Sequence, residues 1–139
     1  MAELGRNLGL LALRLMAGVG IAILHGQTKV FAGGHAWIAQ DATKLGLPLP
    51  PELMGWASSL AEFLGGILIA LGLGTRPAAL ILLVNMSVAV FMHHGADALA
   101  PGSGKELALA YWTAALTLTL TGGGSFALDR FFRFKKKGK

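Results

Sequence analysis

The chain contains no cysteine among its 139 residues, and only 14% of the residues are charged. The absence of cysteine excludes a disulfide framework and any thiol chemistry by this chain itself. A soluble domain usually carries about 25% charged residues, so the low charge argues against an ordinary soluble domain. The sequence also lacks a haem, flavin or NAD motif, because neither Cys-x-x-Cys-His nor a glycine-rich dinucleotide fingerprint is present.

Long apolar runs take the place of the missing charges. A helix needs roughly 20 mostly apolar residues to cross a membrane, and four stretches approach that length, near residues 8–31, 53–73, 77–94 and 106–122. A soluble helical bundle would show polar stripes at helical spacing, and these runs show almost none. We therefore predict an all-α integral membrane protein, a four-transmembrane-helix bundle formed by a single domain over residues 1–139.

The basic residues are distributed unevenly around these runs. Nine of the twelve lysines and arginines lie before or early in the first run, in the turn at residues 74–76, or after the last run. The positive-inside rule then places both termini and that turn in the cytoplasm. Residues 130–139 form a basic cytoplasmic tail, which we interpret as a topology anchor that attracts anionic lipid. Six basic residues without a domain do not indicate nucleic-acid binding.

The long loop between the first two runs carries its own structural signals. Pro48, Pro50 and Pro51 forbid a continuous helix through this segment. Proline followed by Glu52 is typical of a helix start, because both residues suit the first turn. The apolar residues of the loop suggest that it lies on the mouth of the bundle, with a short interfacial helix near residues 35–45.

Several ionisable residues interrupt the apolar runs. In the stretch "ILHGQTKVF", His25 and Lys29 share a helical face with Arg14. Glu62 lies near the middle of the second run, and ionisable groups inside a bilayer usually face the bundle and pair with one another. Four segments thus bring polar groups toward the outer half of the bundle, from the residues His25, Lys29, Glu62, His93 and Glu106.

Two interpretations of this polar cluster stay open at the sequence level. In the structural one, Arg14 or Lys29 forms an ion pair with Glu62 that fixes helix register. In the functional one, His25, Lys29, Glu62, His93 and Glu106 line an outward-facing pocket for a quinone carbonyl, a proton or a polar head group. No metal site is predicted, because His93 and His94 are adjacent and point about 100° apart on a helix.

These residues, in this order, resemble the DoxX family of small bacterial membrane proteins. The resemblance lies in Arg14 with the "HG" and Lys29 that close the first helix, in "AEFLGGILIALGLGTRPAALILLVNMSVAVFMHH" and in "KELALAYWTAALTLTLTGGGSFALD". It implies a four-helix bundle in the bacterial cytoplasmic membrane and a link to respiratory or sulfur redox chemistry. Related DoxD-type chains look like the membrane subunit of thiosulfate:quinone oxidoreductase.

Two functional hypotheses follow from the residues and the resemblance. In the first, the chain is a membrane subunit of a redox system, at most part of a quinone-linked oxidoreductase, and binds a quinone or similar small molecule. In the second, it is a non-catalytic scaffold or assembly factor that recruits a soluble redox protein. The glycine-rich helix faces also suit a homodimer. The sequence names neither the ligand nor the oligomeric state, and it leaves open whether Lys29 faces the pocket or the outer surface.

Overall fold

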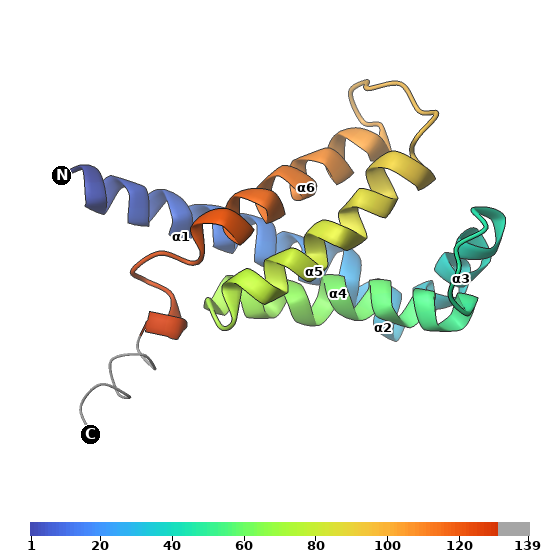
Figure 1. Cartoon of the computed structure of the whole chain (residues 1–139), viewed down its shortest axis with the longest axis horizontal. Helices are drawn as coiled ribbons and strands as arrows, with labels where there is room; N and C mark the ends of the chain where they lie inside the picture. The colour runs from blue at the N-terminus through green and yellow to red at the C-terminus, as the bar shows by residue number, and fades with distance from the viewer. Residues whose placement is uncertain (131–139) are drawn as a thin grey trace.

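The structure, a computed structural model, describes residues 1–130, and most of these residues are helical. In chain order the helices are α1 (Ala2–Gly20), the π-helical segment η1 (Ile21–Gly26), α2 (Gln27–Phe31), α3 (Gly34–Lys44), α4 (Pro51–Leu71), α5 (Thr75–Val88), the π-helical segment η2 (Ala89–His93) and α6 (Gly104–Thr121). In Figure 1 the N-terminus and the last described residues, which follow α6, lie toward one end of the molecule, and α3 lies at the other, which we name the α3 end.

The first helix is a continuous run from α1 through η1 to α2, Ala2–Phe31. The apolar pattern predicted its start near residue 8, and the additional polar turn is held by local contacts. Arg6 lies 3.5 Å from the carboxylate of Glu3, and the Asn7 side chain donates to the Glu3 carbonyl. The break at residues 21–26 from α- to π-helical geometry has no signal in the apolar pattern.

Glycine contacts set the register between α1 and α4. A Cβ placed on Gly18 would lie 2.6 Å from the Gly66 carbonyl oxygen, and one placed on Gly66 would lie 2.7 Å from the Gly18 carbonyl oxygen. Only hydrogen at both positions lets the two backbones approach this closely, which is a common device in membrane helix pairs. Gly18 and Gly66 therefore act as packing residues between α1 and α4.

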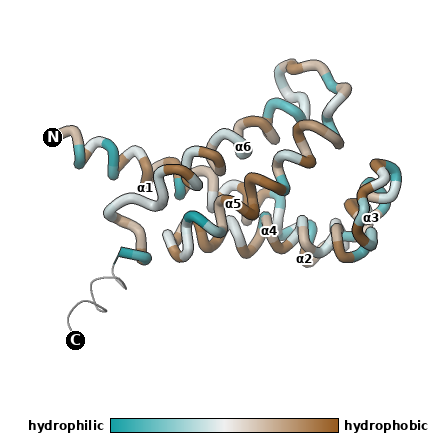
Figure 2. Tube along the Cα trace, in the orientation of Figure 1, coloured by the Kyte–Doolittle hydropathy of each residue, from teal (hydrophilic) through white to brown (hydrophobic). Residues whose placement is uncertain are grey.

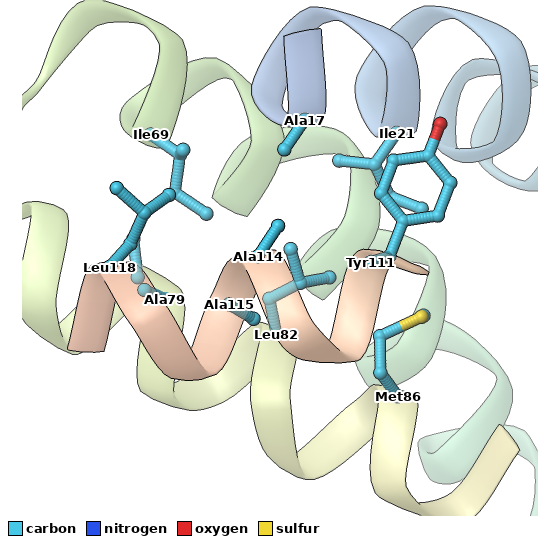
Figure 3. Packing of buried hydrophobic residues seen from close by; sticks show 11 residues of the cluster. Ala17, Ile21, Ile69, Ala79, Leu82, Met86, Tyr111, Ala114, Ala115 and Leu118 are labelled. Carbon is cyan, nitrogen blue, oxygen red and sulfur yellow. The ribbon is translucent and has the colours of Figure 1, made fainter. Parts of the chain in front are cut away.

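The buried apolar core lies where α1, α4, α5 and α6 meet. Ile69 and Leu118 are both fully buried, and Leu82 and Ala115 are 1% exposed. Figure 3 shows Ile69 of α4 against Leu118 of α6, with Tyr111 of α6 reaching the side of Ile21. The core therefore joins the α5–α6 pair to the α1–α4 pair.

Much of the remaining apolar surface faces outward. Within residues 1–130, three helical runs are long and apolar enough to cross a membrane: Ala2–Phe31, Pro51–Leu71 and Thr75–His93. At most 39% of the residues in the most apolar window of each run are buried, and Figure 2 shows hydrophobic positions recurring along α4 and α5. A surface of this kind suits contact with lipid.

The fourth predicted span corresponds to α6, which is not among those three runs. Its 18 residues include Lys105 and Glu106 in the first turn and several threonines, so its mean hydropathy is lower. The predicted four-span bundle is therefore supported for three helices.

The segment after α6 folds back onto the helices at the end that carries the N-terminus. Asp129 accepts hydrogen bonds from the backbone of Gly74 at 2.7 Å and of Thr75 at 3.0 Å, at the start of α5. The Ser125 backbone donates to the Asn7 side chain at 2.9 Å. Residues 131–139, which hold most of the predicted basic tail, lie outside the described residues.

The loop between the first helix and α4 agrees with its sequence signals. Helix α4 begins at Pro51, with Glu52 in its first turn, and a short helix, α3, occupies residues 34–44. The ring of His35 stacks on that of Trp56 with 4.0 Å between centroids, which fixes α3 against α4. This contact makes α3 a wall of the space between the helices.

Candidate functional site

A cavity of about 580 Å³ lies toward the α3 end, between the helices that diverge there. Helices α4 and α5 separate from their shared turn in Figure 1, and the cavity has walls from both, from the first helix, from α3 and from the start of α6. Most of its lining is apolar, including Ile21, Ile38, Leu45, Ala61, Val84, Val88 and Leu107. A cavity of this size is within the usual range for small-molecule sites.

Three polar side chains from three helices meet on the wall of this cavity. The Lys29 ammonium lies 2.6 Å from Glu62 Oε1, and the Asn85 amide donates to the same oxygen at 3.1 Å. Glu62 is 2% exposed and the Lys29 side chain 17% exposed. Because both charges are largely removed from water, each depends on the other for stabilisation.

The carboxylate of Glu62 is satisfied on one side only. Both Lys29 and Asn85 donate to Oε1, whereas Oε2 is buried and accepts no hydrogen bond from the described residues. Buried carboxylate oxygens are rarely left in this state, because losing hydration without a replacement donor is costly. Glu62 is part of the cavity wall, so its carboxylate gives this wall an acceptor that the described residues leave unsatisfied.

His25 and Tyr111 form the aromatic part of the lining. Their rings meet edge to face with 5.6 Å between centroids, and both line the cavity. His25 lies in the π-helical segment η1, and π-helical turns occur frequently at functional sites. The predicted pocket residue His25 is thus placed in the cavity, although its ring contacts Tyr111.

A second group of polar residues lies between α3 and η2. His93 Nδ1 is 3.4 Å from the Asp41 carboxylate, and Lys44 reaches the same aspartate at 3.0 Å. His93 and Asp41 both line the cavity, so the predicted residue His93 lies at its edge. In residues 1–130 no three His, Asp or Glu side chains converge as a metal site would require.

Glu106 does not lie with the other predicted site residues. Its carboxylate accepts from the Gly102 backbone at 3.0 Å, and its backbone donates to the Ser103 hydroxyl at 3.2 Å. Ser103 thus caps the start of α6, and the Glu106 carboxylate bonds the residue before the cap, which is close to a capping box. Glu106 lines a separate hollow on the other side of α6, so the structure gives it a structural role.

The predicted pairing of Arg14 with Glu62 is replaced by the pairing with Lys29. Arg14 is 1% exposed and donates to the Phe126 carbonyl at 3.2 Å, near the start of α5. Helices α1 and α4 run antiparallel, with Gly18 level with Gly66. Glu62 therefore lies beyond Gly18 in the direction of Lys29, whereas Arg14 lies one turn from Gly18 in the opposite direction. Arg14 therefore anchors the segment after α6.

Sequence reasoning did not include Asn85, Tyr111 or Asp41 among the site residues. Of the three, Asn85 has the clearest signal in the sequence, because an amide in the middle of an apolar run is recognisable. Tyr111 carries an apolar ring, and Asp41 belongs to a loop segment with other charges. Only the folded arrangement brings these two residues to the cavity.

The DoxX family model matches residues 9–95. A Haemophilus influenzae chain named "Uncharacterized protein" is 43% identical over 83 residues, which cover 57% of this chain and 61% of that one. The Escherichia coli "Inner membrane protein YphA" is 33% identical over 128 residues, covering 87% and 89% of the two chains. The Bacillus subtilis "Putative oxidoreductase CatD" is 32% identical over 134 residues, covering 95% and 93%. No solved structure gives a significant match.

The matched segment contains the cavity residues His25, Lys29, Glu62 and Asn85, so this polar group lies inside the region that the family model describes. The family model covers more than half of the chain, and two relatives above 30% identity are matched over most of their length. The resemblance inferred from the sequence is confirmed, and the chain belongs to the DoxX family of membrane proteins.

Proposed function

We propose that this protein is a membrane-embedded subunit of a redox system and that its cavity binds a quinone or a similar small amphipathic molecule. The observation that carries the proposal is the polar group of Lys29, Glu62 and Asn85 on the wall of an apolar cavity. A quinone has the same division, with two polar oxygens on an apolar ring and chain. The name "Putative oxidoreductase CatD" of the Bacillus subtilis relative agrees with a redox role.

The edge of the cavity supports a ligand that comes from the lipid. Ile81 and Val84 of α5 line the cavity, yet they are 58% and 61% exposed. The apolar lining is therefore continuous with the outward-facing surface of α5. A ligand held with its polar end near Glu62 can extend an apolar chain along this surface into the bilayer.

The chain itself has no cysteine, so a thiol or a cysteine-bound cluster has to come from another protein. We therefore propose a soluble redox protein as partner, with this chain as the part that meets the quinone pool. A homodimer through the glycine-rich helix faces is a second proposed association. Neither the soluble partner nor the homodimer is required for the cavity to bind its ligand.

We also propose that α6 is the fourth span, with both termini in the cytoplasm and the α3 end facing outward from the cytoplasmic membrane. The hydroxyls of Thr113, Thr117 and Thr121 each donate to the carbonyl four residues earlier. These bonds satisfy the polar groups inside the helix, which makes α6 compatible with lipid despite its threonines. The location of the Escherichia coli relative, named an inner membrane protein, agrees with this membrane.

The test is direct ligand binding by the purified protein in lipid nanodiscs. We expect decylubiquinone, in its oxidised or reduced form, to bind saturably, and Ser58→Phe to weaken that binding at least tenfold because Ser58 lines the cavity. The matched control is Leu120→Phe, on the outward face of α6, where the side chain is 69% exposed. Absence of saturable binding of both forms would overturn the proposal and favour the scaffold hypothesis.

A further inference from the structure

The two oxygens of the Glu62 carboxylate differ in the hydrogen bonds that they accept. Oε1 accepts from Lys29 at 2.6 Å and from Asn85 at 3.1 Å. Oε2 is buried without a donor among the described residues, and an ionised carboxylate oxygen can only accept hydrogen bonds. The group that completes this site must therefore be a hydrogen-bond donor.

The charge of the site restricts the donor further. Lys29 and Glu62 carry opposite charges and lie in contact, so together they are electrically neutral. Most of the remaining lining is apolar, and Asp41, which also lines the cavity, already contacts Lys44 and His93. A charged ligand beside Glu62 would therefore carry an uncompensated charge, which is strongly unfavourable in such surroundings. The donor that fits is a neutral hydroxyl.

This requirement separates the two redox forms of the proposed ligand. A quinone presents two carbonyl oxygens, which only accept hydrogen bonds and would face Oε2 with lone pairs against lone pairs. The corresponding quinol presents two neutral hydroxyls, each able to donate. Hydrogen bonds from a hydroxyl to an ionised carboxylate are among the stronger ones in proteins.

We infer that the cavity selects the reduced form, the quinol, through a hydroxyl that donates to Glu62 Oε2, while the apolar ring and chain lie along the wall that leads to the exposed face of α5. This inference rests on the proposed function, since it names the redox form of the same ligand in the same cavity. It concerns binding, and it requires no electron transfer by this chain.

The test compares three ligands on the unaltered protein in anaerobic nanodiscs. The ligands are decylubiquinone, decylubiquinol and the bis-O-methyl ether of decylubiquinol, which keeps the ring and chain but has no hydroxyl donor. We expect the quinol to bind at least tenfold more tightly than the other two, a difference equivalent to about 1.4 kcal/mol. No variant is needed for this comparison, so it does not depend on whether an altered protein folds.

A substitution at Glu62 then tests whether this residue causes the preference for the quinol over the quinone. Glu62→Gln replaces Oε1 or Oε2 with an amide that donates, so we expect the preference for the quinol over the quinone to fall to less than threefold. The matched control is Glu106→Gln, whose carboxylate caps α6 outside this cavity, and it should keep the tenfold preference.

The outcomes separate the two proposals. If the quinone or the methyl ether binds as tightly as the quinol, the inferred donor to Oε2 is wrong, while quinone binding by the cavity stands. If none of the three ligands binds, the proposed function fails together with the inference. A tenfold preference that survives Glu62→Gln would also overturn the inference, because another residue would then distinguish the two forms.

Discussion

The Lys29–Glu62 pair combines a short contact with deep burial. The two charged atoms lie 2.6 Å apart, and the glutamate is 2% exposed. Burying an ion pair costs several kcal/mol in desolvation, so its net contribution to stability is small, but removal of one partner leaves an uncompensated charge. The pair is therefore best understood as a fixed polar feature of the cavity, with a large penalty for breaking it.

This asymmetry leads to a prediction for Lys29. Lys29→Met should lower the free energy of unfolding by about 3–5 kcal/mol, because it strands the Glu62 carboxylate. The double variant Lys29→Met/Glu62→Met should recover most of the loss, because no unpaired charge remains. Reversible unfolding in mixed detergent micelles measures both changes.

The control for this prediction is Lys44→Met. Lys44 also contacts a carboxylate, that of Asp41 at 3.0 Å, but its side chain is 72% exposed. Exposed pairs contribute less than about 1 kcal/mol, so the expected loss is much smaller. A loss in Lys29→Met no greater than in Lys44→Met would contradict the assigned burial of the pair.

The partner of Glu62 shows what residue patterns can and cannot predict. Helical periodicity places Arg14 and Lys29 on one face, and it correctly indicates that a basic residue of the first helix turns inward to an acid. The choice between them depends on how far α1 slides along α4. Close contact between Gly18 and Gly66 fixes that register, and no periodicity within one helix contains this information.

At the scale of the elements, two π-helical segments contribute to the cavity. Segment η1 contains His25 and η2 contains His93, and both histidines line the cavity. A π-helical segment adds a residue to a helical turn and changes the direction of the side chains that follow. Apolar runs predict that a helix exists at these positions, but they do not distinguish an α-helical turn from a π-helical one.

The start of α5 depends on a residue far away in sequence. The N-cap residue is Gly74, which has no side chain to cap the helix, and Asp129 supplies the acceptors for the backbone of Gly74 and Thr75 at 2.7 and 3.0 Å. A carboxylate at this position also interacts favourably with the positive end of the helix dipole. The segment after α6 therefore closes the α4–α5 turn.

We predict that Asp129→Ala destabilises the protein by about 1–2 kcal/mol, as expected for the loss of a helix cap. Thermal unfolding in detergent measures the change, and limited proteolysis of the segment at residues 122–130 should accelerate with it. The control is Asp97→Ala, whose carboxylate contacts His94 in a loop and is 50% exposed. Equal effects of the two substitutions would contradict a capping role for Asp129.

At the scale of the whole molecule, hydropathy predicts the helices better than the space between them. Residues 8–31, 53–73 and 77–94 correspond to the three runs that can cross a membrane, and the short helix near residues 35–45 is present as α3. The cavity results from the divergence of α4 and α5 toward the α3 end, which Figure 1 shows. Such a divergence depends on packing among four helices, so a pattern along one chain does not predict it.

The number of spans decides on which side of the membrane the two ends of the chain lie. Four crossings place residues 2 and 128 on the same side, whereas three crossings would place them on opposite sides. Because the chain has no natural cysteine, single cysteines report position without any background. Suitable sites are Ala2, Leu128 and the loop residue Ala98, all of which are exposed.

We predict that Ala98→Cys reacts with a membrane-impermeant maleimide in spheroplasts, while Ala2→Cys and Leu128→Cys react only after the membrane is permeabilised. This result follows if α6 crosses the bilayer with its threonine hydroxyls bonded to the helix backbone and the basic ends stay in the cytoplasm. Labelling of Leu128→Cys in spheroplasts, with Ala2→Cys protected, would show that only three helices cross. The cavity would then still open at the α3 end, but α6 would lie along the surface, and Tyr111 would approach His25 from a helix outside the bilayer.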